Sequence, residues 1–257
     1  MVLCGFSIMQ SSLLHIDWLE PHYFGWLAQG VAVTLWLSLL VVIAATALGL
    51  VLAALRASPL WLLRLPAIAW LTLFRNTPLL VQLLFWYFGA ASLLPEAAMN
   101  WLNSPHVLAQ LGTLSLGWPS FEFLAGLLGL TLYSSAFIAE ELRAGIRGVA
   151  RGQFEAATAQ GLKPWQVWRF VILPQALRIA QPPLFGQYMN VVKNSSLTMA
   201  IGLAELSYAS RQVETETLKT FQAFGVATLF YIGIIAVLEV LSRELRNRNR
   251  RLTGELR

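Results

Sequence analysis

Charged residues are scarce in this chain of 257 residues: Asp, Glu, Lys and Arg make up 12% of the sequence, whereas hydrophobic residues make up 57%. The mean hydropathy is +0.62. A soluble domain normally draws about a quarter of its residues from the charged types, and these cover its surface. Because so few charged residues cannot cover the surface of a soluble protein of this size, the composition predicts an integral membrane protein.

Residues that carry chemistry are also few. Cys4 is the only cysteine, which excludes a disulfide framework and a cysteine-based metal cluster. The three histidines, His15, His22 and His106, lack the spacing that places two metal ligands on one helical face. The sequence holds neither a GxSxG nucleophile motif nor a GxxxxGK[ST] phosphate loop. We therefore expect no catalytic residue, no metal site and no ATP hydrolysis by this chain.

Uncharged runs long enough to cross a bilayer occur at several places, given that about 20 helical residues cross a hydrocarbon core of about 30 Å. A further apolar region, residues 179–204, is interrupted by Lys193. Together they predict an all-α membrane protein with five transmembrane helices, in a domain that covers residues 28–245. The four uninterrupted runs are residues 28–55, 76–95, 123–139 and 220–238.

The positions of Lys and Arg predict the orientation, because cytoplasmic loops carry an excess of these residues. Residues 1–27 and the loop at 95–122 each hold two acids and no Lys or Arg. We therefore expect an external N-terminus and a cytoplasmic C-terminus, where residues 246–257 form a basic tail. The basic segments assigned to the cytoplasm are residues 56–75, 143–178 and 243–257.

The net charge of +5 does not indicate a nucleic-acid partner. The basic residues are spread over separate segments that flank the membrane, without interleaved stacking aromatics. Contact with anionic lipid headgroups explains this distribution. Two rival classes remain. A stand-alone ion-coupled carrier would need acids inside the membrane or inverted repeats, but the predicted spans hold no Asp or Glu and show no internal duplication. A membrane-embedded enzyme would need a nucleophile with its base or a metal set at one depth, and the sequence shows neither.

The cytoplasmic loop 143–174 contains a segment punctuated by Gly and Pro. Residues 153–160 are expected to form a short helix that begins near Gln153 and ends before Gly161. Glu155 lies in its first turn, where an acid favours the helix dipole. Its alanines make it thin enough to enter a groove on a partner; an ordinary amphipathic surface helix is the alternative.

This segment carries a family resemblance. Glu155-Ala156-Ala157, followed by Gly161 and Leu173-Pro174, resembles the EAA loop of bacterial ABC importer permeases, a coupling helix that docks in a cleft of the cytoplasmic ATPase. Other motifs, in the family's order, resemble the polar amino-acid permeases for His, Glu, Gln and Arg, in particular the glutamate/aspartate permeases. They are Phe74-Arg75-Asn76-Thr77-Pro78-Leu79-Leu80-Val81-Gln82, Phe137-Ile138-Ala139-Glu140, Leu173-Pro174-Gln175-Ala176-Leu177-Arg178 and Val192-Lys193-Asn194-Ser195-Ser196-Leu197.

The resemblance implies a type I ABC importer permease fold in the bacterial cytoplasmic (inner) membrane. It implies three kinds of partner: a cytoplasmic ABC ATPase dimer, a second permease subunit that is identical or homologous, and an external amino-acid-binding protein. ATP and Mg would bind to the ATPase, so this chain is expected to bind no cofactor. The residues expected to couple to the ATPase are Gln153, Glu155, Ala156, Ala157, Gly161, Leu173 and Pro174.

Lys193 is the residue around which we expect the substrate pathway. A Lys at mid-membrane costs at least about 2.5 kcal/mol, so it should face a wet cavity or a partner group; snorkelling to an interface is the alternative. The apolar stretches on either side are short, which predicts a broken segment there. No acid lies beside Lys193, which favours acidic amino acids, with neutral or basic polar ones as the alternative. The expected pathway residues are Lys193, Asn194, Ser195, Ser196, Asn190, Thr77 and Gln82.

Overall fold

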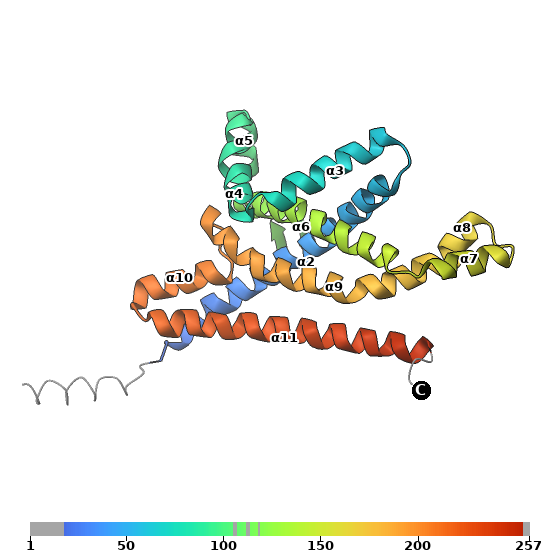
Figure 1. Ribbon diagram of the computed structural model, residues 1–257. Coiled ribbons are helices and arrows are strands. Elements are labelled where there is room, and N and C mark those ends of the chain that lie inside the picture. Colours follow the sequence, from blue (N-terminus) through green and yellow to red (C-terminus); the bar gives the residue numbers. More distant parts are fainter. Residues whose placement is uncertain (1–17, 105–106, 112–113, 118, 254–257) are drawn as a thin grey trace, which may run out of the picture.

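The computed structural model describes residues 18–104, 107–111, 114–117 and 119–253, most of them helical. Cys4, His15 and His106 lie outside the described residues. In Figure 1, α9 and α11 run alongside each other, α2 crosses them, and α4 and α5 project away. These elements are α2 (Pro21–Ala57), α4 (Leu79–Leu84), α5 (Glu96–Asn103), α9 (Leu173–Ser195) and α11 (Thr220–Thr253).

The other elements connect or cover these helices. Among them, α6 lies at the centre of the molecule and packs against both α2 and α9. The helical elements are α3 (Trp61–Asn76), η1 (Phe85–Gly89), η2 (Ala91–Leu93), α6 (Phe121–Arg147), α7 (Arg151–Ala159), α8 (Pro164–Gln166), η3 (Val167–Ile172), η4 (Ser196–Ile201) and α10 (Leu206–Thr217). A short antiparallel pair, β1 (Val107–Leu111) and β2 (Leu114–Gly117), lies in the predicted 95–122 loop and is the one departure from an all-α fold among the described residues.

Three helices are long and apolar enough to cross a membrane within the described part of the chain: α2, α6 and the 220–248 part of α11. They correspond to three of the five predicted spans. Most of the interrupted apolar region at residues 179–204, which was also predicted to span, lies in α9. This helix of 23 residues contains Pro182 and Pro183 and is too polar to qualify as a span by composition.

The second predicted span, residues 76–95, is wrong in its geometry, and so is the loop expected over residues 56–75. Most of that loop forms α3, which is followed by a helical stretch over 79–93 at an angle of 106°. The bend occurs because the ring of Pro78 drives Thr77 out of the helical region, to φ −113° and ψ 138°. The two helices together make one broken span or a re-entrant loop.

The expected break at Lys193 is displaced. Helix α9 continues through Lys193 to Ser195, and the chain then tightens into the 3₁₀ turns of η4. Gly202 ends that segment with φ 85°, a left-handed conformation that glycine adopts without strain. The irregular backbone therefore follows Lys193 instead of containing it.

The core lies where α2, α6 and α9 approach one another. Leu37, Val41, Leu130 and Ile138 are fully buried there. Helices in lipid gain little from the hydrophobic effect, so their association depends on close packing, and small residues at the contact allow it. Gly145 illustrates this: a Cβ at that position would lie 2.6 Å from the carbonyl oxygen of Ala176.

Candidate coupling surface and substrate pathway

The expected coupling helix is present as α7, which starts two residues before the predicted 153–160 segment and ends one residue earlier. Gly161 follows it with φ 81°, the left-handed conformation predicted by a glycine at a helix end. The Gly161 N–H donates to Thr158 O at 2.9 Å, and the Leu162 N–H donates to Ala157 O at 3.3 Å. These bonds satisfy carbonyls that the end of a helix leaves free.

Helix α7 is exposed on every side but one. Ala157 alone among its residues is buried, and it packs with Val167 and Ile172 in a small apolar cluster. Gln153 and Glu155 are exposed. Gln153 Oε1 accepts a hydrogen bond from Gln175 Nε2 at 3.2 Å. Figure 1 shows α7 and α8 projecting beyond the other helices at the side of the molecule where α11 ends. An exposed helix held by a single buried residue suits docking to another protein.

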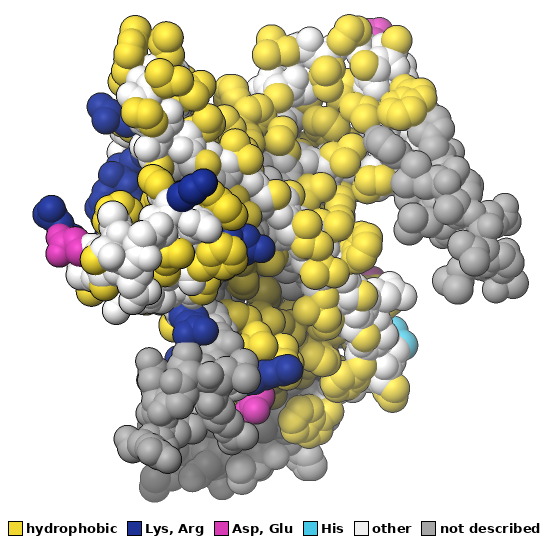
Figure 2. All heavy atoms as spheres, turned by 90° about the vertical axis from the view of Figure 1, so that its right-hand side faces the viewer, with side chains coloured by type: hydrophobic (Ala, Val, Ile, Leu, Met, Phe, Trp, Pro, Cys, Tyr) yellow, Lys and Arg dark blue, Asp and Glu magenta, His cyan; other side chains and the backbone are white. Residues whose placement is uncertain are grey.

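Leu173 and Pro174 begin α9, directly after η3. Pro174 has no N–H, so the helical bond that would run from residue 174 to the carbonyl of Phe170 cannot form. The preceding turn, η3, is correspondingly widened into a π-helix. Leu173 is 37% exposed at the start of α9. Figure 2, which looks onto this end of the molecule, shows Lys and Arg side chains gathered on one half of it.

The predicted pathway residues on α9 and η4 divide into two groups. Asn190 and Lys193, one turn apart, are exposed, and the position one turn earlier is Gly186, which has open space in front of it. Ser195 and Ser196 instead use their hydroxyls on the backbone, donating to Val192 O at 2.8 Å and Lys193 O at 2.7 Å. Asn194 is half-buried. The first group leaves a polar helix face open; the serines stabilise the change from α-helix to 3₁₀.

Thr77 and Gln82 hold the bend between α3 and α4. The Thr77 hydroxyl donates to Leu73 O at 2.8 Å, and Gln82 Nε2 lies 3.1 Å from both Phe74 O and Thr77 O. Gln82 is 7% exposed, and its Oε1 has no hydrogen-bond partner among the described residues. These side chains cap the carbonyls that the bend frees, which is a structural use.

Glu140, on α6, has ion-pair partners that sequence reasoning missed. Its Oε1 contacts Arg56 Nη1 from α2 and lies 3.5 Å from Arg75 Nη1 of α3. The Arg75 guanidinium also lies 5.6 Å from the centre of the Phe137 ring. The sequence spacing offered no signal, because Glu140 lies 84 residues from Arg56.

A second missed residue is Glu205, which follows the apolar region at residues 179–204. Its carboxylate is fully buried and accepts from Tyr231 Oη at 2.8 Å, Tyr208 N at 3.0 Å and Thr34 Oγ1 at 3.4 Å. The bond from Tyr208 caps the start of α10, and the other two reach α11 and α2. Burial raises the pKa of Glu205, and the bonds it accepts oppose that shift. An acid directly after an apolar run was the only sequence signal.

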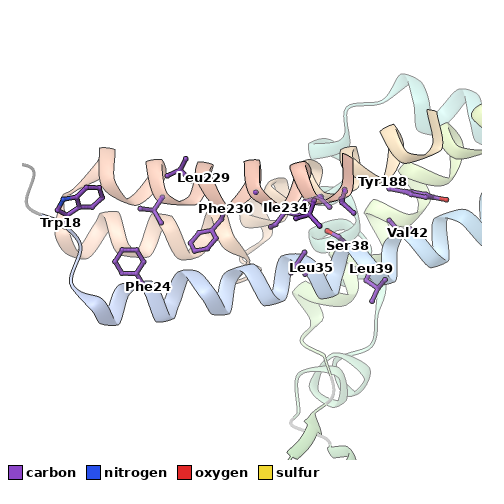
Figure 3. A pocket seen from close by; sticks show the side chains of 15 residues that line it. Trp18, Phe24, Leu35, Ser38, Leu39, Val42, Tyr188, Leu229, Phe230 and Ile234 are labelled. Atoms are coloured by element: carbon purple, nitrogen blue, oxygen red, sulfur yellow. The ribbon is translucent and has the colours of Figure 1, made fainter. Parts of the chain in front are cut away.

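A groove of about 1020 Å³ lies between α2, α9 and α11 (Figure 3). Fifteen residues line this groove, and nearly all of them are apolar. The side chains that carry a polar group are Ser38, Tyr188 and Trp18. The Ser38 hydroxyl has no hydrogen-bond partner among the described residues. A zwitterionic amino acid would lose its hydration there without adequate compensation, so the groove is unsuited to such a substrate.

The fold and the exposed α7 define a class: a helical membrane subunit built to work with a partner on one face. Residues 45–251 match the family model described as "Binding-protein-dependent transport system inner membrane component". Because this match covers most of the chain, the chain belongs to that family.

Relatives and solved structures agree with this assignment. The chain is 34% identical to the glutamate/aspartate import permease protein GltJ of Escherichia coli (strain K12), over 91% of each chain. It is 34% identical to the probable glutamine ABC transporter permease protein GlnM of Bacillus subtilis (strain 168), over 80% of this chain and 85% of the relative. A crystal structure of an amino acid ABC transporter with histidines superimposes with a TM-score of 0.75 at 28% identity, covering 88% of this chain and 95% of that one.

A transporter of lower sequence identity also has this fold. An inward-facing structure of the MetNI methionine ABC transporter superimposes with a TM-score of 0.70 at 17% identity, covering 90% of this chain and 99% of that one. At this identity the likeness concerns the fold alone. It agrees with the expectation of a type I importer permease fold.

Proposed function

We propose that this chain is the permease subunit of an ATP-driven importer for polar amino acids, with glutamate and aspartate as preferred substrates. The observation that carries the proposal is α7, which has the EAA sequence, is held by one buried residue and presents its other faces to solvent. The similarity to an import permease for glutamate and aspartate supports the choice of substrate. Neutral polar amino acids, as for the glutamine relatives, are the alternative.

In this proposal the chain lies in the bacterial cytoplasmic membrane with its N-terminus outside and α7 in the cytoplasm. Basic side chains at the α7 end support that orientation, because positive residues favour the cytoplasmic side. An ATPase dimer docks on α7, a second permease subunit completes the pathway, and an external binding protein delivers the substrate. ATP and Mg bind to the ATPase, and the closure of its dimer drives alternating access through α7.

The first test is to purify the tagged chain from its native membrane in mild detergent and to identify its partners by mass spectrometry. Recovery of a P-loop ATPase that is lost on altering α7 supports the proposal. A partner-free chain that still transports an amino acid after reconstitution contradicts it and favours an ion-coupled carrier.

The docking role of α7 is tested by Glu155→Lys and Gly161→Asp, each assayed in the reconstituted complex. We expect both variants to insert normally but to uncouple ATP hydrolysis from uptake. Gly161→Asp strains a backbone with φ 81°. Gly25→Asp is the control, because Gly25 also has open space around it but lies in α2 and not in α7. Coupled uptake at wild-type rates in both test variants would contradict the docking assignment.

The pathway role of Lys193 is tested by Lys193→Ala. Removing the charge should lower glutamate uptake more than glutamine uptake, because only glutamate carries a net negative charge. Asn190→Ala is the neutral control on the same exposed face of α9. Equal losses for both substrates would assign Lys193 to structure instead of charge recognition.

A further inference from the structure

The turn between α7 and α9 carries large apolar side chains on its surface. Trp165 and Phe170 are each 61% exposed, and Trp168 is 45% exposed. The rings of Trp165 and Phe170 lie 6.0 Å apart, centre to centre. Val167 and Ile172, from the same turn, are instead buried in the apolar cluster with α7. Because Trp side chains collect where hydrocarbon meets lipid headgroups, the exposed rings favour a position of this turn at the membrane surface.

A cavity of about 380 Å³ lies next to this turn, between α2, α6, η3 and α9. Trp168 forms its wall on the side of η3, and Leu173 and Leu177 belong to its wall on the side of α9. These two leucines are 37% and 47% exposed, so the cavity is open at the surface. Apart from Ser58 and the Trp168 indole, the lining side chains are apolar. A hydrocarbon chain fills such a cavity more favourably than water does.

A basic side chain stands at the edge of this cavity. Arg178 lines an adjoining hollow of about 290 Å³ on α9, and the two hollows share Leu177. Arg178 is exposed and forms no ion pair with any described residue. The two acids near the end of α6, which packs against α9, already have partners. Glu140 contacts two arginines, and Glu141 Oε1 accepts from Gln187 Nε2 at 3.2 Å.

We propose that Arg178 and the adjoining cavity bind one anionic phospholipid of the cytoplasmic leaflet. The guanidinium is a planar fork that matches a phosphate with two parallel hydrogen bonds. One acyl chain passes Leu177 and enters the cavity, with Trp168 beside it. Basic pockets between spanning helices on the cytoplasmic side are typical sites for such headgroups. Free phosphate has the charge but nothing to fill the cavity, and a zwitterionic lipid lacks the net charge.

A lipid at this site supports the turn that carries the coupling helix. The turn η3 packs against both α7 and α9, and its Trp168 faces α2 and α6 across the cavity. Filling the cavity therefore restricts how η3 moves relative to the spanning helices. We expect full coupling of ATP hydrolysis to uptake to require anionic lipid. This consequence and the choice of leaflet rest on the proposed function, whereas the lipid site itself does not.

Native mass spectrometry of the purified full chain measures lipid binding without transport. We expect phosphatidylglycerol to bind at least about tenfold more tightly than phosphatidylcholine with the same acyl chains, because only phosphatidylglycerol carries a net negative charge. Arg178→Gln should remove this preference. Arg211→Gln is the control, because Arg211 is also exposed but lies in α10, away from both hollows, and it should keep the preference.

The cavity is tested by a substitution that leaves the charge unchanged. Ala54→Phe places a ring in the cavity and should weaken the binding of phosphatidylglycerol. Ala28→Phe is the control, because Ala28 is exposed on the same helix and lines neither hollow. Glycerol phosphate, which has the charge of the headgroup and no acyl chain, should not displace the lipid. Displacement by glycerol phosphate would reveal a site for anions alone and would overturn the lipid assignment.

Three other results would also overturn the lipid site. The first is equal affinity of the wild-type chain for the two lipids. The second is binding that neither Arg178→Gln nor Ala54→Phe changes. The third is release of the bound lipid when the ATPase subunit is added, which would assign this surface to the ATPase.

The coupling role is tested in the complex with its ATPase and binding protein, reconstituted into phosphatidylcholine vesicles with or without phosphatidylglycerol. We expect phosphatidylglycerol to raise the ratio of uptake to ATP hydrolysis in the wild type and not in Arg178→Gln. A ratio that does not respond, in a chain that binds the lipid, would overturn the coupling role alone. A complex that imports no amino acid in either lipid would overturn the proposed function and leave the binding result standing.

Discussion

Glu205 and Glu140 each join three helices of this molecule, and they do so in opposite ways. Glu205 is fully buried and is bonded by neutral donors from Tyr231, Tyr208 and Thr34. Glu140 is partly exposed and is bonded by charged donors from α2 and α3. A closed set of neutral donors fixes a scaffold and leaves nothing for a ligand. At Glu140 two arginines share one carboxylate, so this partly exposed set keeps a net positive charge.

Among the substitutions that test this comparison, Glu205→Ala should cause the largest loss of stability. Three donors would lose their acceptor inside the protein, at about 1 to 3 kcal/mol each, so we expect a loss of stability of about 3 kcal/mol or more. Thermal unfolding of the detergent-solubilised chain measures it. The control is Glu239→Ala. Glu239 is a partly exposed acid that pairs with Arg243 at 2.8 Å, and its removal should have little effect on stability. A small change in Glu205→Ala would contradict the scaffold role.

The Arg56–Glu140 pair should give the next largest effect. A double-mutant cycle of Arg56→Gln and Glu140→Gln should yield a coupling energy of about 1 kcal/mol, reduced from that of a fully buried pair by partial exposure. The same cycle for Arg151 and Glu155, whose side chains are 92% and 62% exposed, should give a value near zero. Equal coupling in both cycles would show that the Glu140 cluster is no more than surface pairing.

Tyr231→Phe removes one of the three bonds to Glu205 and leaves the acid in place. We expect a loss of about 1 kcal/mol, the ordinary value of one hydrogen bond. Tyr23→Phe is the control, because the Tyr23 hydroxyl reaches Glu216 only at 3.4 Å in an exposed position. Indistinguishable unfolding midpoints for the two variants would contradict a buried network around Glu205.

The smallest expected effect concerns pH. Burial raises the pKa of Glu205 above its ordinary value of 4.5, so the folded state holds this proton to higher pH than the unfolded state. The stabilisation is complete below pH 4.5 and is lost as the pH rises through the folded-state pKa. Glu205→Gln should flatten this part of the curve of stability against pH, whereas Glu239→Gln should not. An unchanged slope in Glu205→Gln would assign the pH dependence to another group.

Much of the fold follows from local pattern. The apolar runs predicted α2, α6 and the first part of α11 because an uncharged stretch of that length has few alternatives in a bilayer. Helix α7 and the left-handed Gly161 were also predicted closely, because helix signals act within a few residues. The α3–α4 bend was missed because α3 contains Arg64 and Arg75, and counting charges made it a loop.

The sequence by itself determined that this chain is a membrane protein, where most of its apolar helices lie and where the short helix α7 begins and ends to within two residues. Only the tertiary structure decided which charges meet. Glu140 reaches Arg56 and Arg75, and Glu205 reaches Thr34, across long separations in sequence. The physical reason is that hydropathy and helix signals are local sums along the chain. Ion pairs instead depend on how helices pack, which no short stretch of sequence specifies.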